Sequence, residues 1–214
     1  MTKTRLLIAR HGNTFGSGDT VTRLGKTDLP LVESGLEQGR MLGRYLKREG
    51  LIPDIAFTSH LQRTAQTMEQ IKLETRETFS CNALTIFNEI DYGPDENQPE
   101  KQVVRRVGED AIKAWDLYAI VPQGWKVDTA SIIANWKQFA DKLVKEHAGK
   151  TILVVTSNGI ARFAPHLTGD FEGFRKEHTI KIATGALCVF EHEDGAHHWH
   201  CTGWNLKPKA LLAE

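Results

Sequence analysis

The nine residues Leu6–Thr14, LLIARHGNT, decide how the fold begins. The apolar run Arg5–Ala9 ends abruptly in an arginine, a histidine and a glycine, which is typical of a buried strand followed by a loop. A second run, TILVVT (Thr151–Thr156), is rich in β-branched residues and is the clearest buried strand of the chain. Both runs end in polar residues, so we expect two buried strands with polar side chains at their carboxyl ends.

Predicted strands and helices alternate outward from these two runs. Further strands are expected at Ile55–Ser59, Leu84–Phe87, Ala186–Glu191 and His198–Trp204, the last two joined by the hairpin dipeptide Asp194-Gly195. Helices are expected at Ser34–Glu49, Leu61–Ile71 and Ile160–Leu167, and over most of Pro99–His147 apart from Val121–Gly124. The alternation predicts a layered α/β fold with a largely parallel sheet, to which the closing hairpin adds an antiparallel strand.

The composition is that of an ordinary folded domain. The chain has 214 residues, 27 basic and 27 acidic side chains, and 40% hydrophobic residues. Intrinsic disorder is excluded, and the basic excess of a nucleic-acid-binding protein is missing. With no repeat or linker, we expect one domain over residues 1–214, with a helical insertion or lid within about residues 99–124.

The cysteines and the apolar segments bear on the cellular location. Cys81, Cys188 and Cys201 are widely spaced and form no CxxC motif, so reduced thiols are expected rather than disulfides or a zinc site. The apolar run near the N-terminus is too short for a signal peptide, and no segment approaches the roughly 20 apolar residues of a membrane span. We therefore expect a cytoplasmic protein that does not bind membranes.

Chemically reactive side chains follow the predicted strands, where ligands bind in α/β folds. They are Arg10, His11 and Thr14 after the first strand, Ser59, His60 and Arg63 after the second, Glu89 after the third, and Ser157 and Asn158 after TILVVT. The planar guanidinium group of arginine matches the oxygens of phosphate. Two arginines and a histidine at neighbouring strand ends therefore indicate a phosphate site.

Four stretches together resemble the histidine phosphatase superfamily, in its phosphoglycerate-mutase-like branch. They are LLIARHGNT, RLGKTDLPLVESGLEQG (Arg23–Gly39), AFTSHLQRTAQT (Ala56–Thr67) and NEIDYG (Asn88–Gly93). The likeness extends from Thr4 to about Arg162 and resumes near Trp204. It implies a three-layer α/β/α fold and metal-independent chemistry, so no cofactor is expected.

The resemblance implies a role for each matching residue. His11 corresponds to the nucleophile that takes the phosphoryl group, a role that requires a neutral imidazole held in one tautomer. Arg10 and Arg63 correspond to the arginines that clamp the phosphate, and Thr14 to a hydroxyl of the phosphate loop. Glu89 corresponds to the acid that protonates the leaving oxygen.

The chain departs from the family pattern after TILVVT. Ser157 stands where the family has a second histidine that contacts the transferred phosphoryl group, and Asn158 replaces the glycine that follows. Removing one preorganised donor to a transition state typically costs roughly 10² to 10³ in rate. Either Ser157 and Asn158 bind phosphate in its place, or another cation substitutes. His60 is the nearest candidate for that cation, and His166 and His178 are more distant ones.

Two functions follow, of which the first is favoured. The first is hydrolysis of a small phosphomonoester through phosphohistidine, because Arg10, His11, Arg63 and Glu89 are all retained. The second is a catalytically silent protein that binds a phosphorylated ligand in a regulatory or scaffold role. Ser17, where mutase-like members often have asparagine, and Arg23 are auxiliary site candidates.

Phosphoglycerate mutase activity is disfavoured by the segment after Glu89. It reads IDYGPDENQPE (Ile90–Glu100), which is acidic and would repel a second phosphate group. We expect the acidic residues of Asp91–Glu96 to guard the rim of the site.

The last part of the chain is rich in histidine. His198 and His200 would share a face of the predicted strand, and His192 and His197 lie nearby, which is one way to bind a metal. Without carboxylates at a fixed spacing, a solvated hairpin is the favoured interpretation, and no metal is expected. The sequence leaves the oligomeric state open, a homodimer included.

Overall fold

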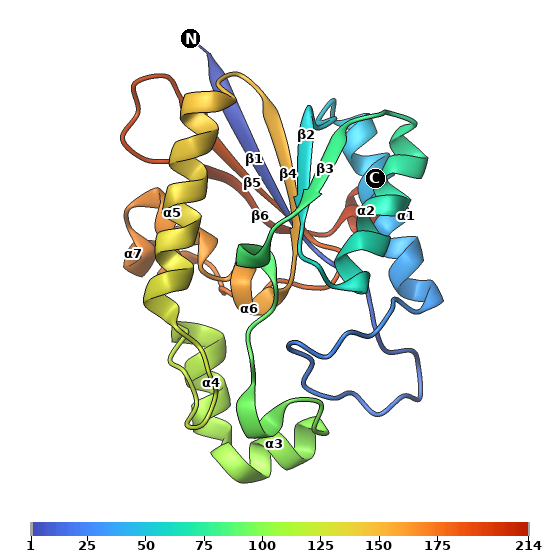
Figure 1. Ribbon diagram of the computed structural model, residues 1–214, viewed down its shortest axis with the longest axis vertical. Coiled ribbons are helices and arrows are strands. Elements are labelled where there is room, and N and C mark those ends of the chain that lie inside the picture. Colours follow the sequence, from blue (N-terminus) through green and yellow to red (C-terminus); the bar gives the residue numbers. More distant parts are fainter. Residues whose placement is uncertain (1, 214) are drawn as a thin grey trace.

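The computed structural model describes residues 2–213, which form a six-stranded mixed sheet in the order β3-β2-β4-β1-β5-β6 (Figure 1). The strands are β1 (Lys3–Arg10), β2 (Ile55–Thr58), β3 (Ser80–Ala83), β4 (Thr151–Thr156), β5 (Leu187–Glu193) and β6 (His200–Leu206). The first four are mutually parallel, whereas β5 is antiparallel to β1 and β6 to β5. The expected mostly parallel sheet with an antiparallel edge is confirmed.

Helices cover both faces of the sheet. They are α1 (Glu33–Arg48), α2 (Gln62–Thr75) and α8 (Pro208–Leu211) on one face, and α5 (Thr129–Glu146), α6 (Asn158–Ala161) and α7 (Phe171–Glu177) on the other. Side chains alternate along β1, because successive residues of a strand point to opposite faces. Leu6 belongs to the same buried cluster as Trp136 of α5, and Leu7 to the cluster of Leu42 on α1. The three-layer α/β/α expectation is confirmed.

The segment that was expected to form an insertion contains two helices. These are α3 (Glu100–Val107) and α4 (Glu109–Tyr118), separated by Gly108 with φ of 88°. Both lie beyond the carboxyl ends of the central strands, at the bottom of Figure 1. The non-helical stretch before α5 spans residues 119–128, which is wider than the predicted interruption. No helix within residues 2–213 has the length and apolar character needed to span a membrane.

The third strand was predicted in the wrong place. Residues Thr85–Phe87 form a short 3-10 helix, and β3 precedes it at Ser80–Ala83. Because β3 is an edge strand and largely exposed, its sequence is polar and lacks the apolar run of a buried strand. The apolar side chain of Phe87 packs in the core from this 3-10 helix, with its ring centroid 5.2 Å from that of Trp136.

Two later elements also differ from expectation. The helix predicted at Ile160–Leu167 is divided into α6 and a 3-10 helix at Ala164–Thr168, which contains Pro165, a residue without a backbone donor. The helix α7 was not predicted. Its N-cap, Asp170, accepts a hydrogen bond of 2.8 Å from the Gly173 N–H.

Candidate active site

The two central strands bring His11 and Ser157 together. In the register of β1 and β4, Arg10 is opposite Thr156, and the N–H of His11 donates a hydrogen bond of 3.0 Å to the Thr156 carbonyl. The next residues on the two strands, His11 and Ser157, are therefore neighbours at the carboxyl edge of the sheet. This is the edge at which α/β folds bind ligands.

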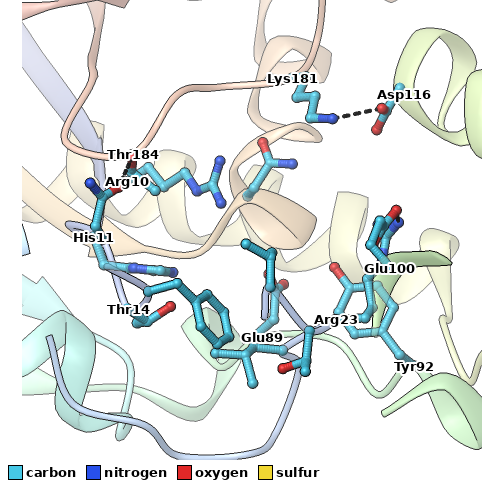
Figure 2. Close-up of a pocket in the computed structure, with 16 residues that line it drawn as sticks. Arg10, His11, Thr14, Arg23, Glu89, Tyr92, Glu100, Asp116, Lys181 and Thr184 are labelled. Atoms are coloured by element: carbon cyan, nitrogen blue, oxygen red, sulfur yellow. Dashed lines mark hydrogen bonds and ion pairs between the residues drawn. The ribbon is translucent and has the colours of Figure 1, made fainter. Parts of the chain in front are cut away.

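A cavity of about 470 Å³ opens at this edge. Figure 2 shows Arg10, His11 and Thr14 on one side of it and Arg23, Glu100 and Tyr92 on the other. The cavity is lined by Arg10, His11, Asn13, Thr14, Phe15, Val21, Thr22, Arg23, Leu24, Glu89, Tyr92, Glu100, Asp116, Asn158, Lys181 and Thr184. Five of the predicted site residues are thus in its wall, together with the auxiliary candidate Arg23.

His11 is held as a neutral imidazole with one nitrogen free. Its Nδ1–H donates a hydrogen bond of 2.7 Å to the carbonyl of Gly12, which leaves Nε2 available as a nucleophile. Burial lowers the pKa of His11 well below its ordinary value, and the nearby charges of Arg63 and Arg10 lower it further. These are the requirements for a nucleophilic histidine.

Two guanidinium groups lie near His11 without a carboxylate partner among residues 2–213. Arg10 donates from Nη1 to the carbonyl of Ile182 at 2.6 Å, and Arg63 donates to the carbonyls of Thr27 at 2.8 Å and Gly25 at 2.7 Å. The Nε atom of each is buried, and it has no hydrogen-bond partner within residues 2–213. Burial lowers the pKa of both arginines, so an anion between them would relieve an unfavourable environment.

Glu89 is held in an environment that favours its protonated form. Burial raises the pKa of Glu89, although the charge of Arg63 opposes this effect. Its carboxyl oxygens accept hydrogen bonds from the N–H groups of Ile90 at 3.0 Å and Gly159 at 3.1 Å. A Cβ on Gly159 would lie 2.3 Å from Glu89 Oε1, so the site requires glycine there. A carboxyl of this kind can serve as a general acid.

Ser157 and Asn158 follow β4 directly and differ in how they reach the cavity. Asn158 lines it, and its Oδ1 accepts a hydrogen bond of 2.8 Å from the N–H of Ile182. Ser157 is fully buried, and its Oγ has no hydrogen-bond partner among the described residues. Neither Ser157 nor Arg63 is part of the cavity lining, so their contact with a phosphate group stays a prediction.

His60 and Ser17 lie away from the cavity. Both are exposed, and neither is part of its lining. The N–H of His60 donates a hydrogen bond of 2.8 Å to Asn88 Oδ1, which holds this residue at the surface. His166 stacks on Phe171, with 4.0 Å between ring centroids. The structure therefore does not place a substitute cation at His60 or His166.

The acidic residues of Asp91–Glu96 were predicted to guard the rim of the site, but they have other partners. Asp91 pairs with Lys26 at 2.9 Å, and Asp95 accepts a hydrogen bond of 2.7 Å from Trp125 Nε1. Glu96 accepts hydrogen bonds of 2.9 Å from the N–H groups of Gly25 and Thr27. All three carboxylates are used to fix loops beside the site. Glu100, at the end of the same segment, does line the cavity.

Several cavity residues were not anticipated from the sequence. Tyr92, Asp116, Lys181 and Thr184 come from loops and from α4, far apart along the chain. Lys181 Nζ pairs with Asp116 Oδ2 at 2.8 Å, which connects α4 to the loop before β5 (Figure 2). Tyr92 lies within the stretch NEIDYG but was not singled out as a site residue. No local motif surrounds Asp116, Lys181 or Thr184, so only the tertiary fold identifies them.

The histidine-rich end differs from the expected arrangement. His198 lies in the turn before β6, which begins at His200, so the two do not share a strand face. His192 Nε2 lies 3.0 Å from the carbonyl oxygen of Ala196. Within residues 2–213, no three or more His, Cys, Asp or Glu side chains are grouped closely enough to hold a metal ion.

Comparison with known proteins places the chain in a family. The model of the histidine phosphatase superfamily (branch 1) matches residues 6–207. A 2,3-bisphosphoglycerate-dependent phosphoglycerate mutase from Chelativorans sp. (strain BNC1) is 31% identical over 195 residues, which are 86% of this chain and 90% of that protein. The enzyme of the same name from Treponema denticola is 33% identical over 112 residues, but the match spans only 52% of this chain and 45% of the relative.

Solved structures show the same fold. A phosphoglycerate mutase from Bacillus anthracis str. Sterne superposes with a TM-score of 0.81 at 16% identity and covers 100% of this chain and 98% of its own. A putative alpha-ribazole-5'-P phosphatase from Escherichia coli superposes with a TM-score of 0.70 at 19% identity, covering 95% and 97%. The chain belongs to the histidine phosphatase superfamily, whose members among these matches are phosphatases or mutases.

Proposed function

We propose that the protein hydrolyses a small phosphomonoester through a phosphohistidine at His11. One observation carries the proposal: Arg10 and Arg63, neither in an ion pair with a described residue, lie near a buried histidine whose Nε2 is free. Burial raises the pKa of Glu89, and the two arginines outnumber this one carboxyl, so this end of the cavity has an excess of positive charge. A phosphate group supplies the missing negative charge and accepts from several donors at once.

In the first step, His11 Nε2 attacks the phosphorus atom and the bond from phosphorus to the ester oxygen breaks. Arg10 and Arg63 stabilise the charge on the phosphoryl oxygens. Glu89 donates its proton to the departing oxygen, so the alcohol leaves in neutral form. Thr14, Ser157 and Asn158 would donate further hydrogen bonds to the phosphoryl group.

In the second step, water attacks the phosphohistidine. The carboxylate of Glu89, now deprotonated, accepts a proton from that water, and the bond between phosphorus and Nε2 breaks. Inorganic phosphate leaves, and His11 and Glu89 return to their starting protonation states. No metal or cofactor takes part in these steps.

A silent phosphate-binding protein is the alternative, and Ser157 is the observation that favours it. A buried serine supplies one uncharged donor at the position where the resemblance implies a histidine. The retained His11 and Glu89 are expected to support turnover without that histidine, at a reduced rate.

The test compares the wild type with His11→Ala on a panel of aryl and alkyl phosphates, with the exposed His200 changed to alanine as a control. We expect turnover in the wild type and in His200→Ala, and a loss of roughly 10⁴-fold or more in His11→Ala. An acid-labile, base-stable phosphoryl adduct should form in the wild type and be missing from His11→Ala. Tight binding of phosphate without turnover of any ester would establish the silent alternative.

A further inference from the structure

The part of the cavity away from His11 contains two more cations, and each has a carboxylate partner. Arg23 forms an ion pair with Glu100, and Lys181 forms one of 2.8 Å with Asp116. All four side chains line the cavity (Figure 2). The leaving group of a bound phosphomonoester would lie between these two ion pairs, because the phosphate occupies the end beside His11.

Arg23 is fixed in this arrangement. Its guanidinium lies 5.5 Å from the ring centroid of Tyr92 and 5.2 Å from that of Trp125, within the range of cation–π attraction. Its backbone N–H also donates a hydrogen bond of 2.9 Å to the carbonyl of Gln98. These contacts hold Arg23 beside Glu100, although its buried Nε has no hydrogen-bond partner within residues 2–213.

Asp116 is held from two sides. Besides Lys181, the buried guanidinium of Arg162 lies 3.7 Å from Asp116 Oδ1. Arg162 in turn lies 4.0 Å from the ring centroid of Trp115 and donates a hydrogen bond of 2.6 Å to the Trp115 carbonyl. This cluster anchors α4 to the region that follows β4, and it places Lys181 and Arg162 on the same carboxylate.

These pairs determine what the leaving-group region can accept. An anionic group that enters it meets the carboxylates of Glu100 and Asp116 and must compete with them for Arg23 and Lys181, at a cost in free energy. An uncharged group meets no such cost and can pack against the apolar lining residues Phe15, Val21 and Leu24. A second cavity of about 330 Å³ continues beyond the Lys181–Asp116 pair, with Leu117 and Ile182 in its wall.

We infer that the substrate is a phosphomonoester whose leaving group is uncharged and partly apolar, and that Glu100 and Asp116 reject leaving groups with a second anionic charge. The inference rests on the proposed function, since it assumes that phosphate binds beside His11. With this selectivity the site would disfavour a phosphoglycerate, because the leaving group of a phosphoglycerate carries a carboxylate.

The experiment measures binding of two inert ligands by calorimetry. They are 4-phosphonobutyrate and its primary amide, which have nearly the same shape and differ by one negative charge. The proteins are the wild type, the Glu100→Gln/Asp116→Asn double variant, and Asp54→Asn as a control. Asp54 also belongs to a surface ion pair, with Lys150 at 3.1 Å, and is not part of the cavity. Thermal melts check that all three proteins are folded.

We expect the wild type and Asp54→Asn to bind the amide at least about tenfold more tightly than the carboxylate. The double variant leaves Arg23 and Lys181 without their carboxylates, so the preference should fall to about threefold or less, or reverse. Equal binding of the two ligands by the wild type would overturn the inference while leaving the proposed function intact. Failure of both ligands to bind, together with no turnover, would overturn both proposals.

Discussion

The two ends of the cavity contain the same kinds of charged side chain but arrange them differently. Beside His11, Arg10 and Arg63 donate only to backbone carbonyls and have no ion-pair partner within residues 2–213. At the other end, Arg23 and Lys181 each face a carboxylate. Only the first arrangement has no carboxylate paired with either cation within residues 2–213. Whether a cation already has a carboxylate partner, rather than how many cations are present, is expected to determine where an anion binds.

The largest effect that tests this comparison is expected for Glu89→Gln. Because burial raises the pKa of Glu89, the wild type should lose activity as the pH rises through that pKa and the proton needed by the leaving group is lost. Glutamine cannot donate this proton, so kcat/KM should fall roughly 10²- to 10⁴-fold and the alkaline decrease should disappear. Glu100→Gln, at the other end, should keep the alkaline decrease. A full pH profile of kcat/KM for each protein is the measurement, and an unchanged profile in Glu89→Gln would remove Glu89 from the mechanism.

A smaller effect is expected for Gly159→Ala. The added methyl group would lie 2.3 Å from Glu89 Oε1 and push the carboxyl out of place, which should cost roughly 10²-fold in kcat. Gly16→Ala is the matched control, because its Cβ would approach only Asp19 Oδ2, at an ordinary 3.4 Å. Steady-state kinetics and melting temperatures of both variants are compared. Wild-type kcat in Gly159→Ala would show that the position of Glu89 is not critical.

Variants of Ser157 test whether the side chain at the end of β4 contacts the phosphoryl group. Ser157→His, which introduces the second histidine that the resemblance implies, should raise kcat on a generic aryl phosphate by at least roughly tenfold, because it adds a preorganised donor. Ser157→Ala should lower kcat, by about tenfold if Oγ donates to the phosphoryl group. Equal kcat values in all three proteins would mean that phosphate binds away from the end of β4.

The smallest effect concerns stability. His11 has a lowered pKa in the folded protein, so its contribution is fully present above the unfolded value of about 6.5 and is lost as the pH falls toward the folded pKa. Relative to His11→Gln, the wild type should therefore lose at most about 1.4 kcal/mol of unfolding free energy per pH unit below pH 6.5. Denaturant titrations between pH 5 and 8 measure this, and parallel curves would contradict a buried neutral imidazole.

The residues around His11 could be grouped from the sequence because they follow local motifs. LLIARHGNT and TILVVT combine an apolar strand with the polar residues that follow it, so strand and site are visible in one short stretch. The leaving-group end could not be predicted in this way. Asp116 and Lys181 meet only through the packing of α4 against a loop 65 residues away. The acidic run after Glu89 suggested a charged rim, but composition could not show that Asp95 would be used by Arg106 and Trp125.

The position of β1 in the sheet has a consequence for how the protein folds during synthesis. The strand β1, which His11 follows, is made well before its partners β4 and β5, which begin at Thr151 and Leu187. A nascent chain that has emerged only as far as α5 thus exposes an apolar strand with neither neighbour available. Closure over such long stretches of chain is slow, and unpaired strands of this kind are prone to aggregate. His11 therefore gains its surroundings late, and chaperone dependence is expected to be greatest before β5 emerges from the ribosome.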